Sequence, residues 1–158
     1  MTDWEEFAAE EPELAATVRA RLEAAQHHVL ATLRADGSPR VSGTEVSWHR
    51  GHLTLGSMPG ARKALDLRRD GRCALHGNPG DGSITGASPD VKISGLATEV
   101  TGEEHAAWAS EAQPPSADSH LFRLDLAEVV TTAVADDQTH LVITLWTPER
   151  GVRAFHRS

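Results

Sequence analysis

Short runs of β-forming residues, many of them separated by tight turns, recur along the sequence from residue 28 onward, and they constrain the fold more than any other feature. The first run, 28–34, leads into Asp36-Gly37, where the glycine can adopt a positive φ. The runs 39–49 and 52–57 follow and are separated by a two-residue turn. Three such segments with short connections predict an antiparallel meander.

The second half of the chain continues this pattern. A strand is predicted at 91–101, and Gly95 inside it indicates a bulge or a bend. The runs 120–135 and 139–147 predict a long hairpin. The remaining predicted strands are 72–77 and a short one within 148–158. Six or more antiparallel strands of this kind are typical of a small β-barrel.

Helices are predicted around this sheet rather than within it. Residues 3–26 have a helical pattern, with Asp3 as the N-cap and Pro12 in the first turn of a second segment. Two shorter helices are predicted at 61–69 and 103–111. We therefore expect a mainly β protein with peripheral helices.

Length and composition fit a single globular domain. The 158 residues are enough to bury a core, and 39% of them are hydrophobic. Within this domain, residues 1–27 are expected to form an N-terminal helical segment packed on the barrel, and residues 28–158 to form the barrel itself. The stretch 78–90 is crowded with Gly, Pro, Ser and Asp and is predicted to be a loop.

Charge and hydropathy exclude several classes of function. The formal net charge of -8 argues against nucleic-acid binding, which needs a basic face to displace phosphate counterions. No apolar run is long enough for a membrane span, and the N-terminus lacks the basic start and apolar core of a signal peptide. Cys73 is the only cysteine, which excludes an internal disulfide. We expect a cytoplasmic protein with no nucleic-acid or membrane partner.

Two adjacent cations, Arg62 and Lys63, stand at the start of the helix predicted at 61–69. A helix N-terminus has unpaired N–H groups and the positive end of the dipole, so cations there are unfavourable without a bound anion. A phosphate would remove this conflict, with the arginine as a fork and the lysine as a point charge. The charge pattern alone leaves open the alternative that both side chains are solvated.

The strand 39–49 has polar residues on both faces. Alternation places Arg40, Ser42, Thr44 and Val46 on one face and Val41, Gly43, Glu45 and Ser47 on the other. A strand of small polar residues leaves room for a flat ligand that hydroxyl groups can hold. An exposed edge strand explains the same pattern, so the pattern by itself favours neither interpretation.

Neither a metal site nor a nucleophile is predicted. The nine histidines lack the spacing of metal ligands. Cys73 lies in an apolar strand, where a free thiol is usually inert. Tryptophans such as Trp48, Trp108 and Trp146 more often anchor a core or an interface than stack on a cofactor.

Several short motifs follow one another in a fixed order between His28 and Leu75. They are Asp36-Gly37-Ser38-Pro39, Arg40-Val41-Ser42, Leu55-Gly56-Ser57, Ala61-Arg62-Lys63 and Leu67-Arg68-Arg69-Asp70. Their order and spacing resemble the flavin-binding split-barrel family of pyridoxamine 5'-phosphate oxidase-like proteins, which includes the F420-dependent (deazaflavin) reductases. The resemblance implies a split β-barrel.

The resemblance also implies roles for the residues in these motifs. Arg62 and Lys63 would bind the terminal phosphate of the cofactor. Arg40-Val41-Ser42 would flank the flavin or deazaflavin ring and the ribityl chain. Gly56 and Ser57 would meet the pyrimidine edge of the ring, largely through backbone groups.

Family members are homodimers with the cofactor at the subunit interface, so the partner chain is also implied to contribute to the site. Trp146, together with Arg153 and His156 near the C-terminus, would be its contributions. The oxidases of the family have a lysine where this chain has Glu45, and they end in Arg-Leu-x-Pro, which residues 153–158 do not match. These departures imply a substrate other than pyridoxamine phosphate.

The activity implied by the resemblance is hydride transfer between FMN, or alternatively F420, and a small or hydrophobic acceptor. No side chain stands out as a proton donor. The alternative is a split-barrel protein that binds flavin or haem without catalysis.

Overall fold

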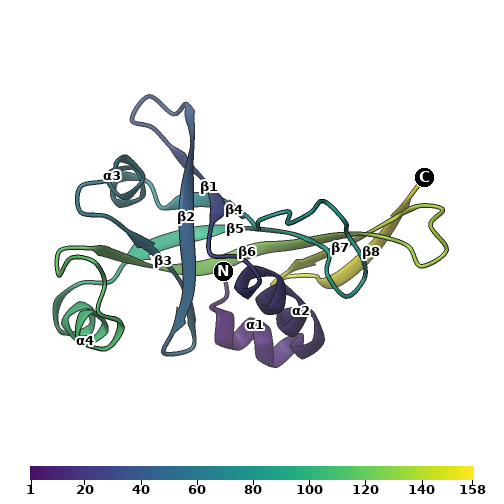
Figure 1. The fold of residues 1–158 in the computed structure, drawn as a ribbon, viewed down its shortest axis with the longest axis horizontal. Coiled ribbons are helices and arrows are strands. Elements are labelled where there is room, and N and C mark those ends of the chain that lie inside the picture. The colour runs from purple at the N-terminus through teal and green to yellow at the C-terminus, as the bar shows by residue number, and fades with distance from the viewer.

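Six antiparallel strands close into a barrel in the computed structural model, which describes residues 1–158 (Figure 1). They are hydrogen-bonded in the order β3-β2-β1-β4-β5-β6, and β3 also pairs with β6. Their bounds are β1 His28–Leu33, β2 Pro39–His49, β3 His52–Ser57, β4 Arg72–His76, β5 Asp90–Glu99 and β6 His120–Val134. The predicted mainly β barrel is confirmed.

The second half of β6 leaves the barrel and carries an arm of two further strands. β7 (Leu141–Thr147) pairs with β6 from Val129 to Val134, and β8 (Gly151–Arg157) pairs with β7. The arm extends to one side of the barrel and ends at the C-terminus (Figure 1). The short strand predicted in the tail is therefore present.

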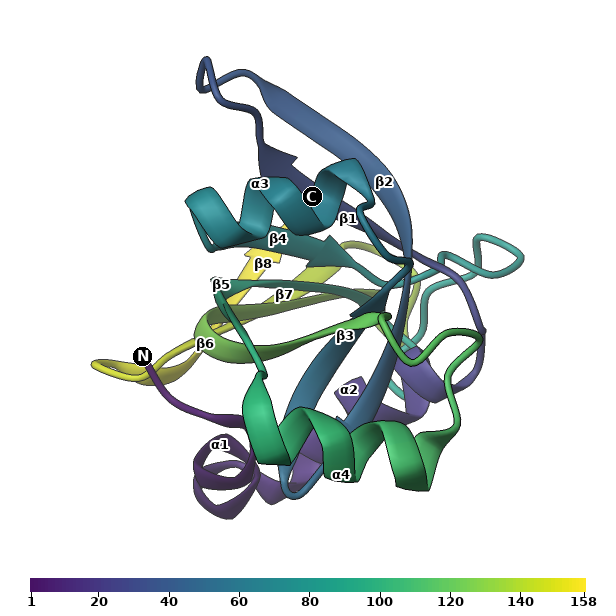
Figure 2. The ribbon, with the colours of Figure 1, turned by 90° about the vertical axis from the view of Figure 1, so that its left-hand side faces the viewer.

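Four helices surround the barrel. They are α1 Trp4–Glu10, α2 Pro12–Glu23, α3 Arg62–Arg69 and α4 Gly102–Ala112. As predicted, Asp3 caps α1 by accepting a 2.9 Å hydrogen bond from the N–H of Glu6, and Pro12 lies in the first turn of α2. α3 and α4 lie on opposite sides of β3 (Figure 2). No helix is both long and apolar enough to cross a membrane.

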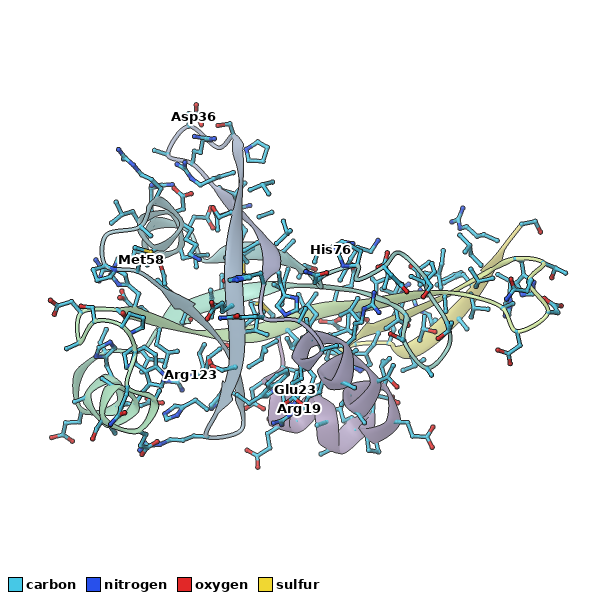
Figure 3. All side chains as sticks on the ribbon, viewed as in Figure 1. Arg19, Glu23, Asp36, Met58, His76 and Arg123 are labelled. Atoms are coloured by element: carbon cyan, nitrogen blue, oxygen red, sulfur yellow. The ribbon has the colours of Figure 1, made fainter.

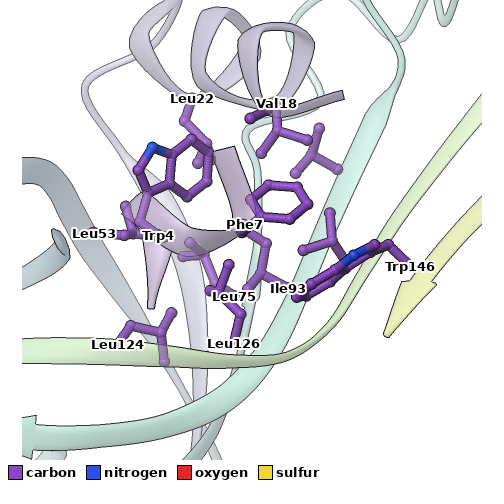
Figure 4. Close-up of a cluster of buried hydrophobic side chains, with 13 residues drawn as sticks. Trp4, Phe7, Val18, Leu22, Leu53, Leu75, Ile93, Leu124, Leu126 and Trp146 are labelled. Atoms are coloured by element: carbon purple, nitrogen blue, oxygen red, sulfur yellow. The ribbon is translucent and has the colours of Figure 1, made fainter. Parts of the chain in front are cut away.

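The main hydrophobic core lies between the barrel and the pair α1–α2 (Figure 4). It combines Trp4, Phe7, Val18 and Leu22 of the helices with Leu53, Leu75, Ile93, Leu124, Leu126 and Trp146 of the strands. The rings of Phe7 and Trp146 are both fully buried, with centroids 4.6 Å apart. The N-terminal helices and the barrel thus share one core.

A bulge interrupts β5 at the glycine inside the strand. The register between β5 and β6 shifts between Ser94 and Gly95, as the sequence predicts. A Cβ atom on Gly95 would lie 1.9 Å from the carbonyl oxygen of Asp125. Only glycine fits this position, because the backbone of β6 occupies the space of a side chain.

Candidate functional site

A half-open cavity of about 580 Å³ lies between α3 and α4, the two helices that flank β3 in Figure 2. Its walls are residues 43–47 of β2, residues 56–58 at the end of β3, Lys63 of α3 and residues 112–115 at and just after the end of α4. Trp108 adds an aromatic side chain to the wall on the α4 side. The volume is in the range of cavities that bind small molecules.

Two glycines in the cavity wall, Gly43 and Gly56, leave space that side chains would otherwise fill. A Cβ atom built on either residue would meet no other atom within 4 Å, and neither glycine has a positive φ. Neither the backbone nor the packing of this chain therefore requires glycine there. The absence of two side chains leaves a shallow bed along β2 and β3.

The start of α3 forms the cationic edge of the cavity. Ala61, the N-cap, makes no side-chain capping hydrogen bond, so the first turn of α3 keeps unpaired N–H groups. The Nζ of Lys63 donates to the carbonyl oxygen of Gly43 at 2.7 Å. Burial lowers the pKa of Lys63, while the nearby carboxylate of Glu45 acts to raise it. Arg62 is exposed and forms neither a hydrogen bond nor an ion pair through its side chain.

The turn before α3 is held in place by a buried histidine. His120 accepts a hydrogen bond at Nε2 from the N–H of Gly60 (3.1 Å), and its Nδ1 lies 2.7 Å from Oε1 of Glu99. A neutral imidazole satisfies both contacts when Nδ1 carries the proton. Glu99 also accepts from Nη2 of Arg68 at 2.8 Å. Residues 58–60, which include the exposed Met58 labelled in Figure 3, are thereby fixed beside the cavity.

A second buried group joins α3 to the barrel. The carboxylate of Asp66, which is only 3% exposed, accepts from Thr32 on β1 at 2.8 Å and from Nε of Arg40 on β2 at 2.7 Å. Arg69 donates to its other oxygen at 3.1 Å. Asp66 thus sets the position of α3, and with it the position of Arg62 and Lys63, relative to β2.

The family model for pyridoxamine 5'-phosphate oxidase matches residues 14–133, which is most of the chain. The chain belongs to this family. The match includes β2, β3 and α3, the three elements that carry the strand face and the cationic edge of the cavity.

Solved structures of low sequence identity share the fold. PhzG from Burkholderia lata 383, in complex with tetrahydrophenazine-1-carboxylic acid, has a TM-score of 0.64 at 16% identity, covering 97% of this chain and 92% of that one. A pyridoxamine 5'-phosphate oxidase-related, FMN binding protein from Nostoc punctiforme has a TM-score of 0.62 at 10% identity, with 94% and 96% covered. HutZ, the haem storage protein from Vibrio cholerae, has a TM-score of 0.54 at 18% identity, with 74% and 89% covered. The split barrel expected from the sequence is thus confirmed. No protein of curated function matches the chain in sequence.

The residues assigned from the family resemblance do not all lie in the same place. Gly56, Ser57 and Lys63 line the cavity, and Arg62 lies beside Lys63 at the start of α3. Val41 is 71% exposed on the outer face of β2, two residues before Gly43.

Five of the predicted residues do not line the cavity of their own chain. Ser42 belongs to the inward-facing set of β2, and Arg40 of the same set is bound to Asp66. Trp146 lies outside the site, because its face of β7 turns toward α1 and buries the ring completely against Phe7. Arg153 and His156 lie on the arm, where His156 contacts His140 at 2.9 Å.

Other cavity residues were not singled out individually from the sequence. Gly43 was assigned to a strand face without a role, and Trp108 was assigned to a core or an interface. The wall beyond α4 comes from Gln113, Pro114 and Pro115, where Gln113 ends the helix in the left-handed conformation (φ 47°). The position of this wall opposite β2 depends on the pairing of β3 with β6, and these two strands are far apart in sequence.

Asp66 should make the stability of the protein sensitive to acid. Burial by itself raises the pKa of Asp66, but hydrogen bonds from Arg40, Thr32 and Arg69 outweigh burial and hold the pKa at about 2, against an ordinary value of 3.8. Because the folded-state pKa is lowered, the stabilisation is complete above the unfolded-state pKa and is lost as the pH falls through the folded-state value.

We therefore expect the free energy of unfolding to decrease between pH 3.8 and about pH 2, and to decrease less steeply in Asp66→Asn. Urea unfolding followed by tryptophan fluorescence at a series of pH values measures both slopes. Identical slopes in the two proteins would contradict the assignment, since all other carboxylates are unchanged.

Proposed function

We propose that the protein binds a phosphorylated flavin or deazaflavin in the cavity and uses it for hydride transfer to a small or hydrophobic acceptor. One observation carries the proposal: the bed formed by Gly43 and Gly56 adjoins the cationic start of α3. A flat ring fits the bed, and a phosphate fits the uncapped helix end beside Lys63 and Arg62.

The residues of the chain would bind and orient the cofactor, which itself supplies the hydride chemistry when bound. Lys63 would act as a point charge on the phosphate, and Arg62, which has no other partner, would add a fork of donors. The apolar parts of Val46, Met58 and Trp108 would shield one side of the cavity from water. The titratable side chains in the cavity wall are Glu45 and Lys63, and we assign neither of them the role of a general acid.

We propose FMN as the cofactor and F420 as the alternative. Membership of the pyridoxamine 5'-phosphate oxidase family and the fold shared with an FMN binding protein support FMN. F420 also carries a phosphate on a ribityl-type chain, so the same cationic edge fits both. Glu45 in the cavity wall stands where the oxidases of the family have a lysine, which supports an acceptor other than pyridoxamine phosphate.

We also propose that the protein forms a homodimer with the cofactor at the interface. The outer face of the arm supports a dimer, because Val130, Ile143, Leu145 and Phe155 line a shallow hollow there, with Glu128 and Arg157 at its side. The Nε of Arg153 on the same face is buried without a hydrogen-bond partner. Light scattering of the purified protein tests the proposal, and a monomer at micromolar concentration would overturn it.

Mass spectrometry of small molecules released by denaturing the purified protein tests the cofactor assignment directly. We expect FMN or F420 in an amount near one per chain. A protein that carries neither, and that binds neither when they are added, would contradict the proposal. Oxidation of NADPH, or of reduced F420 when an acceptor is present, would then separate an enzyme from a carrier that binds the cofactor without turnover.

A further inference from the structure

Two histidines that are distant in sequence meet at the tip of the arm, away from α3 and α4 (Figure 1). His140 directly precedes β7, and His156 lies on β8. The antiparallel register places His156 opposite Val142, so it shares a face of the sheet with His140, two residues earlier. Nε2 of His140 lies 2.9 Å from Nδ1 of His156. The pairing of β7 with β8 brings the two rings together, and the spacing of histidines along the chain does not reveal it.

The turn that carries His140 is fixed by its own hydrogen bonds. The carbonyl oxygen of His140 accepts from the N–H of Ala135 at 2.9 Å, and Gln138 adopts a positive φ of 65°. One carboxylate oxygen of Asp137 accepts from the N–H of Thr139 at 3.0 Å and from its hydroxyl at 2.7 Å. The backbone therefore holds the imidazole of His140 in a defined place.

The same hydrogen bonds decide which nitrogen of the neutral His140 ring carries the proton. A carboxylate only accepts, so the Thr139 hydroxyl gives its proton to Asp137 and its oxygen is left to accept. Nδ1 of His140 lies 2.7 Å from that oxygen and donates to it. Nε2 then holds a lone pair on the side of His156. A histidine with one N–H given to an outer partner and the other nitrogen free is arranged as metal-binding histidines are.

The distance between the two nitrogens suits a single metal ion. With metal–nitrogen bonds of about 2.0–2.1 Å, two ligands at a right angle lie about 2.9 Å apart, and two at the tetrahedral angle about 3.4 Å apart. The observed 2.9 Å matches the right angle, so both rings can reach one ion without separating. The proton on Nδ1 of His156 would then pass to Nε2 of the same ring.

The surroundings of the pair favour a cation and leave it accessible. The His140 side chain is 25% exposed, and His156 is an exposed residue. Asp137 places a carboxylate oxygen 3.8 Å from Nδ1 of His140. Arg157, the neighbour of His156 in sequence, lies on the other face of β8, where it lines the hollow of the arm. A negative charge is therefore close to the pair, and the adjacent positive charge is turned away from it.

We propose that His140 and His156 bind a divalent transition-metal ion, with Thr139 and Asp137 as the outer partners of His140. Imidazole nitrogens suit Cu²⁺, Ni²⁺ and Zn²⁺, whereas Mg²⁺ prefers oxygen ligands. Nitrogens at a right angle favour the tetragonal geometry of Cu²⁺ and Ni²⁺ over the tetrahedral geometry of Zn²⁺. The bound ion joins the β6–β7 turn to β8 and stabilises the arm. This site is separate from the cavity and does not depend on the proposed function.

Isothermal titration calorimetry of the protein, prepared without a histidine tag, tests the site with Ni²⁺, Cu²⁺, Zn²⁺ and Mg²⁺ in turn. We expect one ion per chain at the tightest site, with Cu²⁺ bound most tightly and no binding of Mg²⁺. His140→Ala and His156→Ala should each lower the affinity for Ni²⁺ at least tenfold, because a single imidazole remains. Thr139→Val should lower it about tenfold, because the outer hydrogen bond to His140 is lost. Saturating Ni²⁺ should raise the Tm of the wild type and not that of the two alanine variants.

His27→Ala is the matched control, because it also removes one exposed histidine but lies outside the arm. Its affinity for Ni²⁺ should equal that of the wild type. Wild-type affinity in His140→Ala or in His156→Ala, or an equal loss in His27→Ala, would overturn the assignment. A dissociation constant in the millimolar range for the wild type would also overturn it, since the two rings would then not act together.

Discussion

Replacing both Arg62 and Lys63 with alanine is expected to weaken binding of the cofactor by about 2–4 kcal/mol, or roughly 30- to 1000-fold in affinity. The two side chains are the cations nearest to the uncapped first turn of α3. Charge-assisted hydrogen bonds to a phosphate are the strongest contacts that this edge of the cavity offers. Titration of the purified apoprotein with FMN or F420, followed by fluorescence, measures the loss.

The dependence on salt gives a second readout of the same contacts. Arg62 is exposed, so its attraction for a phosphate is screened as ionic strength rises. We expect the difference between wild type and the double variant to shrink at high salt. A difference that did not depend on salt would indicate that the substitutions act through packing instead.

A control with the same change in net charge separates a local effect from a global one. Lys92 and Arg150 are both exposed and neither lines the cavity. The double alanine variant of these two residues should bind the cofactor as the wild type does. Unchanged affinity after removal of Arg62 and Lys63 would refute the phosphate assignment for the start of α3.

Local sequence patterns were sufficient to predict the strands. β2 spans Pro39–His49 and β3 spans His52–Ser57, which are the predicted runs. They could be predicted because short turns delimit both strands. The bulge at Gly95 was also predictable, since a glycine inside a strand has few other causes. Each of these features depends on residues close together in the chain.

Features that depend on distant contacts could not be predicted in this way. The pairing of Ser57 with His120 closes the barrel, yet the two residues are separated by 63 positions. The same closure brings His120 within reach of Gly60 and Glu99. Nothing in the local pattern around His120 distinguishes it from a surface histidine.

In the candidate site, too, the residues that depend on local motifs were predicted, and those that depend on distant contacts were not. Lys63, Gly56 and Ser57 were identified from motifs because their elements follow one another directly along the chain. Asp66 was not singled out, because its role depends on Thr32 and Arg40 from two other strands. Trp146 was assigned to the cofactor by resemblance, whereas the packing of α1 against β7 places it in the core.

The second large effect is expected from filling the bed of the cavity. Gly56→Val is expected to lower cofactor affinity by about 1–3 kcal/mol, because the new side chain would occupy the space on which a ring lies. Gly43→Val should act in the same direction, and the double variant should lose binding altogether. Fluorescence titration with FMN or F420 measures each loss.

These substitutions should leave the fold intact, and that separates them from ordinary destabilisation. Valine suits a strand, and a Cβ atom at Gly43 or Gly56 meets nothing within 4 Å. The free energy of unfolding should therefore stay the same or increase slightly, since glycine is unfavourable inside a strand. By contrast, Gly95→Ala should destabilise the protein by about 3 kcal/mol, because its Cβ would collide with the carbonyl oxygen of Asp125.

Substitutions at the three glycines thus distinguish two cases: at Gly43 and Gly56 the space beside the glycine is open to a ligand, whereas at Gly95 the chain itself fills it. Loss of binding without loss of stability at Gly43 and Gly56, together with loss of stability at Gly95, would support the cavity as the cofactor site. Valine at both Gly43 and Gly56 with full cofactor affinity would contradict that assignment. It would mean that the ring lies elsewhere, even if the phosphate is bound at the start of α3.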